Sequence, residues 1–290
     1  MPEKEECMIL YMTSTPGGIN RATGRPEPLS NKNHFVDRLK ADWKPHSKAV
    51  LIASEPDEAR FNSAMAKSYL ECFNRSGLSM DSIDVLDRRE PKIVEMLDRF
   101  DVVILAGGHV PTENAWFHQL RLREHLRHFR GIVIGISAGT MNCAEVVYAQ
   151  PEEEGEAVNP QYQRFLTGLG LTKTKVIPHY NQTIDAVLDG KRLYQDITYP
   201  DSMGESFYCL TDGAYIRKDT RTRKEMLYGE AYLISDGEIG LISKTGGEFE
   251  IPVKRRIPAE LMGALGFLAY GMLLGVLLTR QIMEEKRGRI

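Results

Sequence analysis

Short apolar runs alternate with helix-like sequence over the first two-thirds of the chain. Five runs read as strands, and the longest are apolar enough to be buried on both faces of a sheet. The runs are 8–12, 49–53, 83–86, 101–106 and 131–136. Strands that alternate with helices in this way predict a parallel sheet with helices on both faces, and therefore an α/β fold.

Helical spacing fills the segments between these strands. Between Glu58 and Ser76, apolar side chains recur every three or four positions, and Gly77 is a suitable helix end. The apolar positions are Phe61, Met65, Tyr69 and Cys72. Further helices are predicted from Pro91 to Phe100 and over 112–130.

After residue 178 the pattern changes to one typical of antiparallel strands. The segments 208–216 and 231–242 each place an Asp-Gly dipeptide between strand-like runs. The dipeptides are Asp212-Gly213 and Asp236-Gly237. Asp-Gly is a favoured two-residue hairpin turn, so the sequence predicts two hairpins that extend the sheet antiparallel near the C-terminus.

The end of the chain differs from the rest and predicts an apolar tail, 256–290, after an α/β domain, 1–255. Residues 261–278 carry no charge, and a run of this length is just sufficient to cross a bilayer as a transmembrane helix. Gly271 and Gly275 form the G-x-x-x-G pattern of closely packed membrane helices. A membrane anchor is the favoured interpretation. The alternative is a soluble helix that is buried or that forms a homo-oligomer.

Composition narrows the function classes. The net charge is −3, which gives no general electrostatic attraction to nucleic acid. Four cysteines show no C-x-x-C spacing, so we expect reduced thiols and no structural zinc site. They are Cys7, Cys72, Cys143 and Cys209. The polar N-terminus carries no signal-peptide pattern, and we expect a cytoplasmic protein, membrane-associated if the tail anchors it.

A nucleophile motif follows the last buried strand. Residues 135–139 read Gly-Ile-Ser-Ala-Gly and lead into a segment that starts a helix. A G-x-S-x-G sequence between strand and helix predicts a sharp turn that lifts the hydroxyl of Ser137 above the sheet. The backbone amide of Ala138 is a natural oxyanion donor, and Gly108 can supply the second unless Gly107-Gly108 is only a turn.

A serine nucleophile needs a general base within hydrogen-bond reach. His179 follows the strand 175–178, at the edge where open α/β sheets assemble their sites. The other histidines lie in polar or arginine-rich segments, except for His109, which is placed to line the site. The carboxylate partner of the base is expected in the acidic run 151–156, where the pattern leaves several glutamates open.

Four motifs together resemble peptidase family S51, the dipeptidase E and cyanophycinase group, whose fold is related to class I glutamine amidotransferases. They are Leu105–Gly108, Gly135–Gly139, Gly168–Leu171 and Val176–Asn181, and the resemblance covers about 8–251. It implies that Ser137 is the nucleophile, His179 the base and Glu152 the acid, with Glu153 and Glu154 as alternative acids. It also implies cleavage of small peptides next to acidic residues, without a metal or organic cofactor.

Other functions remain open from the residues alone. A glutamine amidotransferase would carry cysteine at 137 and a carboxylate at 181, but this chain has Ser137 and Asn181. An esterase of the α/β-hydrolase type also orders its triad as serine, acid and histidine. However, the 42 residues between Ser137 and His179 leave little room for further strand–helix units. A catalytically idle binding protein, tethered by its tail, is the third alternative.

Overall fold

The structure is a computed structural model, and it describes residues 7–20 and 22–252. The chain divides into two units, 1–251 and 252–290. The predicted anchor at 261–278 lies outside the described residues. Among the residues that are described, no helix has the length and apolar character needed to cross a bilayer.

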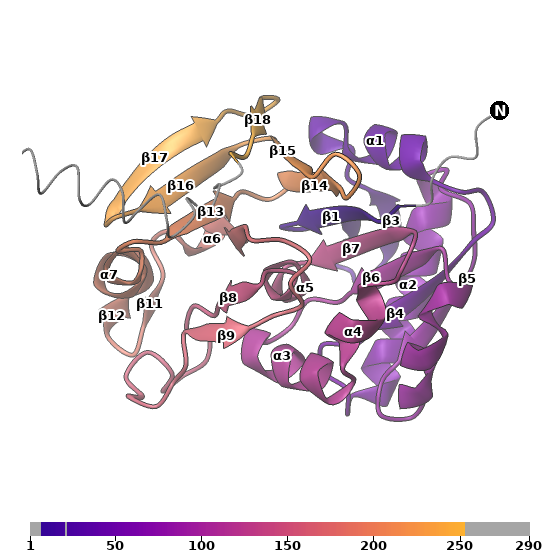
Figure 1. Ribbon diagram of the computed structural model, residues 1–290, viewed down its shortest axis with the longest axis horizontal. Coiled ribbons are helices and arrows are strands. Elements are labelled where there is room, and N and C mark those ends of the chain that lie inside the picture. The colour runs from indigo at the N-terminus through magenta and orange to yellow at the C-terminus, as the bar shows by residue number, and fades with distance from the viewer. Residues whose placement is uncertain (1–6, 21, 253–290) are drawn as a thin grey trace, which may run out of the picture. The chain divides into compact units, whose positions relative to one another are not determined.

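An eight-stranded sheet forms the centre of the first unit (Figure 1). Five neighbouring strands run parallel, and they contain all five strands predicted from the apolar runs. In spatial order they are β1 (Ile9–Thr13), β7 (Ile132–Ile136), β6 (Val102–Leu105), β4 (Ser47–Ile52) and β5 (Met80–Leu86). Beyond β1 the sheet continues antiparallel through β14 (Tyr215–Asp219), β15 (Lys224–Tyr228) and β18 (Glu248–Glu250). The predicted parallel α/β core with an antiparallel extension is therefore confirmed.

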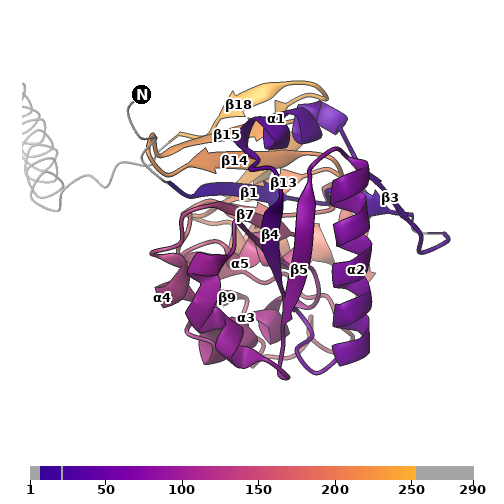
Figure 2. The ribbon, with the colours of Figure 1, turned by 90° about the vertical axis from the view of Figure 1, so that its right-hand side faces the viewer.

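Helices cover both faces of the parallel strands because successive side chains of each strand are buried on opposite faces. Leu10 and Val133 pack with the core of one face, and Tyr11 and Ile134 with the core of the other. Figure 2 shows α2 on one side of β4 and β5, with α3 and α4 on the other. The helical elements in this part of the chain are α1 (Phe35–Asp42), α2 (Ala59–Arg75), the 3₁₀ segments Lys32–His34 and Pro91–Arg99, α3 (Val110–Gln119), α4 (Leu122–Leu126) and α5 (Ala138–Asn142).

The apolar positions that predict α2 differ in burial. Tyr69 and Cys72 are buried, whereas 53% of the surface of Phe61 is exposed and Met65 is half-buried. The other buried positions of the helix are Asn62, Ala66 and Phe73. Spacing alone predicted the helix, but it did not predict which of these positions are buried.

A second, four-stranded sheet has its own apolar core, built around Phe207 and Tyr194. Its strands, in spatial order, are β10 (Lys175–Ile177), β13 (Ser206–Leu210), β16 (Ala231–Ser235) and β17 (Glu238–Ser243). Only β10 and β13 run parallel. Short pairs and helices complete the unit: β2 (Gly17–Ile19) with β3 (Pro26–Leu29), β8 (Val146–Tyr148) with β9 (Phe165–Thr167), β11 (Val187–Leu188) with β12 (Lys191–Arg192), α6 (Tyr180–Thr183), the π-helical segment Leu193–Thr198 and α7 (Tyr199–Asp201).

One of the two predicted hairpins is confirmed and the other is wrong. Asp236-Gly237 joins β16 to its antiparallel neighbour β17, and both residues have positive φ, as a type I′ turn requires. Asp212-Gly213 instead joins two different sheets, since β13 pairs with β10 and β16 while β14 pairs with β1 and β15. The dipeptide favours a reversal of the chain, but the partners of the flanking strands are chosen by long-range packing.

Candidate active site

Polar and small residues follow the parallel strands of the large sheet at one edge. Ser14, Ser54, Gly107 and Ser137 come directly after or within two residues of β1, β4, β6 and β7. The register aligns these strand ends, because Thr13 lies beside Ile136 and Leu105 beside Gly135. Parallel strands therefore bring residues from distant parts of the sequence to one line, which is where sites of open α/β sheets form.

Ser137 occupies a strained turn between β7 and α5. Its backbone angles are φ 51° and ψ −111°, which are rare for a residue with a side chain. A Cβ on Gly135 would lie 2.8 Å from the Cα of Thr140, and one on Gly139 would lie 2.4 Å from the carbonyl oxygen of Leu105. Both glycines of the motif are thus required by close backbone packing around the serine.

His179 lies across from this turn, at the carboxyl end of β10. Its Nε2 is 3.0 Å from the Oγ of Ser137, so the two predicted residues meet at hydrogen-bond distance. His179 has a left-handed backbone, with φ 56°, immediately before α6. About a quarter of its side chain is exposed, which leaves the imidazole accessible from the cleft.

Asp212, and not Glu152, holds the other side of the imidazole. Its Oδ1 lies 2.6 Å from the Nδ1 of His179. The parallel pairing of β10 and β13 explains this contact, since Ile177 lies beside Cys209 and the residues that follow each strand end next to one another. Sequence reasoning assigned the segment around Asp212 to a hairpin turn and therefore missed it. The available signal was an acidic residue at a strand end, the same signal that singled out His179.

Three further side chains position this carboxylate. The hydroxyl of Ser14 donates to Oδ1 of Asp212 over 2.9 Å and accepts the backbone N–H of His179 over 2.8 Å. The side-chain amide of Gln182 donates to Oδ2 of Asp212. Asn181 accepts the backbone N–H of Asp212 over 3.0 Å. Asn181 stands where a glutamine amidotransferase would carry a carboxylate. In this chain it instead holds the loop of Asp212 through an uncharged hydrogen bond.

The glutamates predicted as acids lie in the loop between β8 and β9, and their side chains are exposed. The structure shows no hydrogen bond from Glu152, Glu153 or Glu154 to His179 within its described residues. Loss of contact with water, caused by the surrounding protein, raises the pKa of Glu152 to about 7. The electrostatic effect of nearby His109 acts in the opposite direction. The residue still keeps exposed surface. Glu152 therefore lies near His179, and the structure shows no hydrogen bond between the two among the residues it describes.

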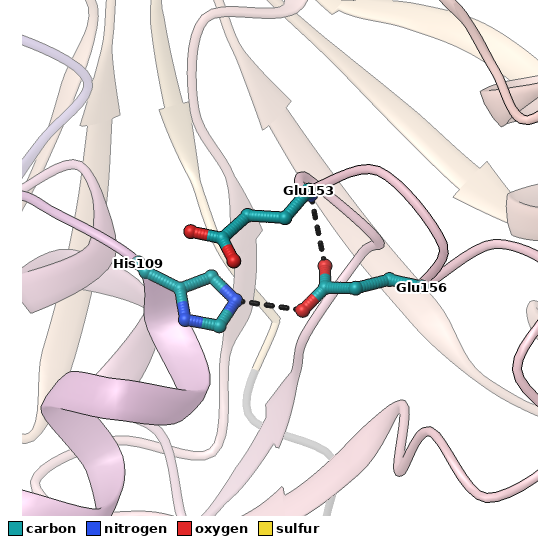
Figure 3. Close-up of side chains that lie close together, drawn as sticks. All are labelled: His109, Glu153 and Glu156. Atoms are coloured by element: carbon teal, nitrogen blue, oxygen red, sulfur yellow. Dashed lines mark hydrogen bonds and ion pairs between the residues drawn. The ribbon is translucent and has the colours of Figure 1, made fainter.

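His109 anchors this acidic loop from the start of α3 (Figure 3). Its Nε2 lies 2.8 Å from Oε1 of Glu156, whose Oε2 accepts the backbone N–H groups of Glu152 and Glu153. Hydrogen bonds from these groups and from His109 lower the pKa of Glu156, although burial acts in the opposite direction. His109, Glu153 and Glu156 are close enough to share a metal ion, but both oxygens of Glu156 are already engaged in ordering the loop.

The two predicted oxyanion donors differ in their surroundings. Ala138 is the first residue of α5, and the N–H groups of a first helical turn have no partner within the helix. Gly107 is the glycine beside the nucleophile, because a Cβ there would lie 3.2 Å from the Cβ of Ser137. A Cβ on Gly108 would instead meet Ser54 at 2.5 Å. The absence of a side chain at Gly107 keeps space beside Ser137, and the absence of one at Gly108 allows the close approach of Ser54.

A pocket of about 380 Å³ contains the hydroxyl and the imidazole. One wall comes from the β1–β2 loop and the other from α2. The lining residues are Ser14, Thr15, Ile19, Gly24, Phe61, Ala64, Met65, Ser68, Tyr69, Gly107, Ile136, Ser137 and His179. Arg164, the arginine that immediately precedes β9, is outside this lining and is paired with Asp201.

The model of peptidase family S51 matches residues 53–222, which is more than half of the chain. A crystal structure of a peptidase from an acI-B1 Actinobacterium is similar, with a TM-score of 0.59 and 16% identity over 85% of this chain and 98% of the other. A peptidase E-type protein from Listeria monocytogenes EGD-e, at 16% identity over 81% and 98% of the two chains, has a TM-score of 0.46. No curated protein sequence matched.

Proposed function

Because this chain belongs to peptidase family S51, we propose that it cleaves short peptides with Ser137 as nucleophile, His179 as general base and Asp212 as the acid of the triad. The observation that carries this assignment is one continuous chain of contacts. It runs from Oγ of Ser137 to Nε2 of His179 over 3.0 Å, and from Nδ1 of His179 to Asp212 over 2.6 Å. Family membership supports the peptidase activity, and the resemblance predicted from the motifs is confirmed.

The contacts support acyl transfer in two steps. In the first, Nε2 of His179 takes the proton of Ser137 while Oγ attacks the carbonyl carbon of the scissile bond. The same proton then passes to the departing amine, and the acyl group remains as an ester on Ser137. In the second step, a water molecule gives a proton to Nε2, attacks the ester and releases the acid, and Ser137 recovers its proton.

Asp212 acts through the imidazole in this mechanism. Its contact with Nδ1 fixes the tautomer that presents an unprotonated Nε2 to Ser137, and its charge stabilises the imidazolium formed during attack. The first amide of α5, from Ala138, and a backbone amide of the Gly107-Gly108 segment would bind the developing oxyanion. A helix N-terminus also favours negative charge there.

The preference for acidic residues stays a prediction that the resemblance implies. An acidic side chain is bound best by arginine or lysine, and neither type occurs among the described residues that line the pocket. Arg164 is already paired with Asp201. The acidic group of such a substrate would have to bind outside this pocket.

Two measurements test the proposed function. A fluorophosphonate probe should label the wild-type protein on Ser137, and a dipeptide library should be hydrolysed. In Ser137→Ala both activities should fall by at least ~10⁴-fold with the circular dichroism spectrum unchanged. Ser63→Ala, which alters an exposed serine of α2, serves as the matched control.

The other outcomes separate the alternatives. Labelling of Ser137 without cleavage of any peptide would favour an esterase. The absence of both labelling and hydrolysis would favour a catalytically idle binding protein and would contradict the peptidase assignment.

A further inference from the structure

The α2 helix presents a second apolar face that the core of the domain does not use. Phe61, Ala64, Met65 and Ser68 are spaced as one helical face, and all four line the pocket of Ser137. Ala66 and Phe73, on a different face of the helix, are buried in the core. Phe61 keeps 53% of its surface exposed and lines the pocket, so its ring is available for contact with a bound substrate.

This face and the catalytic groups share one cavity. Ile19 and Ile136 add apolar surface to the same lining, and Tyr69 adds its ring beside Met65. Among the described residues of the lining, His179 and Tyr69 are the only side chains that titrate. A substrate bound for attack by Ser137 must therefore place part of itself against an apolar and uncharged wall.

The volume of the pocket indicates how much of a substrate it can enclose. At about 380 Å³ the pocket lies near the lower end of the range for small-ligand sites, roughly 300–1,000 Å³. This volume is sufficient for one large side chain together with the peptide group next to it, and the rest of a substrate can extend through the open mouth of the pocket.

We propose that the α2 wall of the pocket is a specificity subsite that takes a bulky apolar side chain, such as leucine or phenylalanine, from a residue adjoining the scissile bond. Phe61 and Met65 are its specificity-determining residues. This assignment rests on the proposed peptidase function, and it adds to that function the class of side chain that one side of the bond must carry. An acidic residue, if the enzyme requires one, belongs on the other side of the bond.

Steady-state kinetics on a matched peptide panel test the subsite. The panel varies one position of Ala-Ala to leucine, phenylalanine or aspartate, first at the amino and then at the carboxyl residue, and repeats both series with aspartate at the other position. The wild-type kcat/KM should rise about 10–100-fold when leucine or phenylalanine replaces alanine at one of the two positions. Aspartate at that same position should give no such increase.

Two variants assign the preference to α2. In Phe61→Ala/Met65→Ala the ratio of kcat/KM for phenylalanine over alanine peptides should fall to about threefold or less, mainly through KM. In Phe61→Arg the same position should gain rate with aspartate and lose rate with phenylalanine. Lys67→Ala, an exposed residue of α2 outside the pocket lining, should keep the wild-type ratio.

The results distinguish the subsite from the peptidase activity itself. If Ser137 is labelled and peptides are cleaved, but the ratio is flat or insensitive to the Phe61 and Met65 changes, the subsite is wrong and the peptidase assignment stands. Aspartate preferred over phenylalanine at both positions would likewise overturn the subsite. If no peptide is cleaved, the peptidase assignment fails and the subsite fails with it.

Discussion

The same dipeptide, Asp-Gly, occurs in two regions with different consequences. Asp236-Gly237 closes a hairpin, and the carboxylate of Asp236 accepts the backbone N–H of Gly204 over 2.9 Å. Asp212-Gly213 leads the chain from one sheet into the other, and the carboxylate of Asp212 lies on His179. Both aspartates follow a strand and precede a glycine with positive φ. Asp236 therefore stabilises a turn, whereas Asp212 contacts an imidazole because the parallel neighbour of its strand, β10, ends at His179.

The largest expected difference separates these two aspartates. Asp212→Asn should lower kcat by about 10³–10⁴-fold, because an amide in place of the carboxylate no longer fixes the productive tautomer or stabilises the imidazolium. Asp236→Asn keeps an oxygen acceptor for Gly204 and should leave kcat within about twofold. Steady-state hydrolysis by the two purified variants measures the difference. Equal activities would remove Asp212 from the triad.

Removal of the Ser14 hydroxyl tests how much the positions of Asp212 and His179 contribute to kcat. Ser14→Ala deletes one donor to the Asp212 carboxylate and one acceptor for the N–H of His179. A hydrogen bond to a charged group contributes about 1.5–3 kcal/mol, so kcat should fall roughly 10–100-fold. Ser14→Thr keeps the hydroxyl and should recover most of the activity. A fall equal to that of Asp212→Asn would show that Ser14 takes a direct part in the reaction.

Glu152 is the acid that the family resemblance implies, and its substitution can be compared directly with that of Asp212. Glu152→Gln should change kcat less than about threefold, because Glu152 makes no hydrogen bond to His179 in the described structure, whereas a triad acid would cost about 10³-fold or more. Urea unfolding of the wild type and the variant at several pH values adds a second measurement. A loss of activity close to that of Asp212→Asn would restore Glu152 as the acid.

The pH dependence follows from the raised pKa of Glu152, about 7 in place of 4.5. Between these values the native protein holds a proton that the unfolded chain has released, so this group's contribution to stability falls as the pH rises and levels off above pH 7. Glu152→Gln removes the contribution. The difference in unfolding free energy between variant and wild type should therefore shift in favour of the variant from pH 4.5 to pH 7. A constant difference would contradict the shifted pKa.

The smallest effects are expected at the two glycines. Gly213 and Gly237 have φ of 92° and 82°, and alanine at Gly237 should cost about 1 kcal/mol of folding free energy, which lowers the melting temperature by about 2–4 °C. Gly213→Ala should cost more, because the new Cβ would lie 2.7 Å from Cδ of Lys32. Only Gly213→Ala should also lower kcat, by a few-fold, because it shifts the backbone that carries Asp212. Equal kcat values for the two variants would show that the aspartate tolerates this shift.

The sequence predicted the parallel core because each of its strands is a local apolar run. Leu51, Ile104 and Ile134 are fully buried, and their runs needed no knowledge of partner strands. The nucleophile could be predicted for the same reason, since the strand, the glycines and the helix start that position Ser137 are contiguous. His179 also followed from its place at the end of a short apolar strand.

The proposed acid and the proposed subsite could not be predicted in the same way. The contact of Asp212 with His179 depends on β13 lying parallel to β10, and these strands are separated by α6, the β11–β12 hairpin, a π-helical segment and α7. Phe61 and Met65 fit the helical period of α2 as well as core residues do, and only the position of the helix over the edge of the sheet turns them toward the pocket. Both depend on long-range packing, which local patterns do not contain.

The separation of the catalytic groups along the chain has a consequence during synthesis. Ser137 lies on the eight-stranded sheet, His179 and Asp212 lie on the four-stranded sheet, and Ser14, which holds Asp212, is 198 residues away from it. A nascent chain that has not reached β13 lacks the carboxylate for its imidazole, and the ribosome makes the N-terminal strands first. With the proposed triad, we expect such a growing polypeptide to lack hydrolytic activity until residues of both sheets have come together.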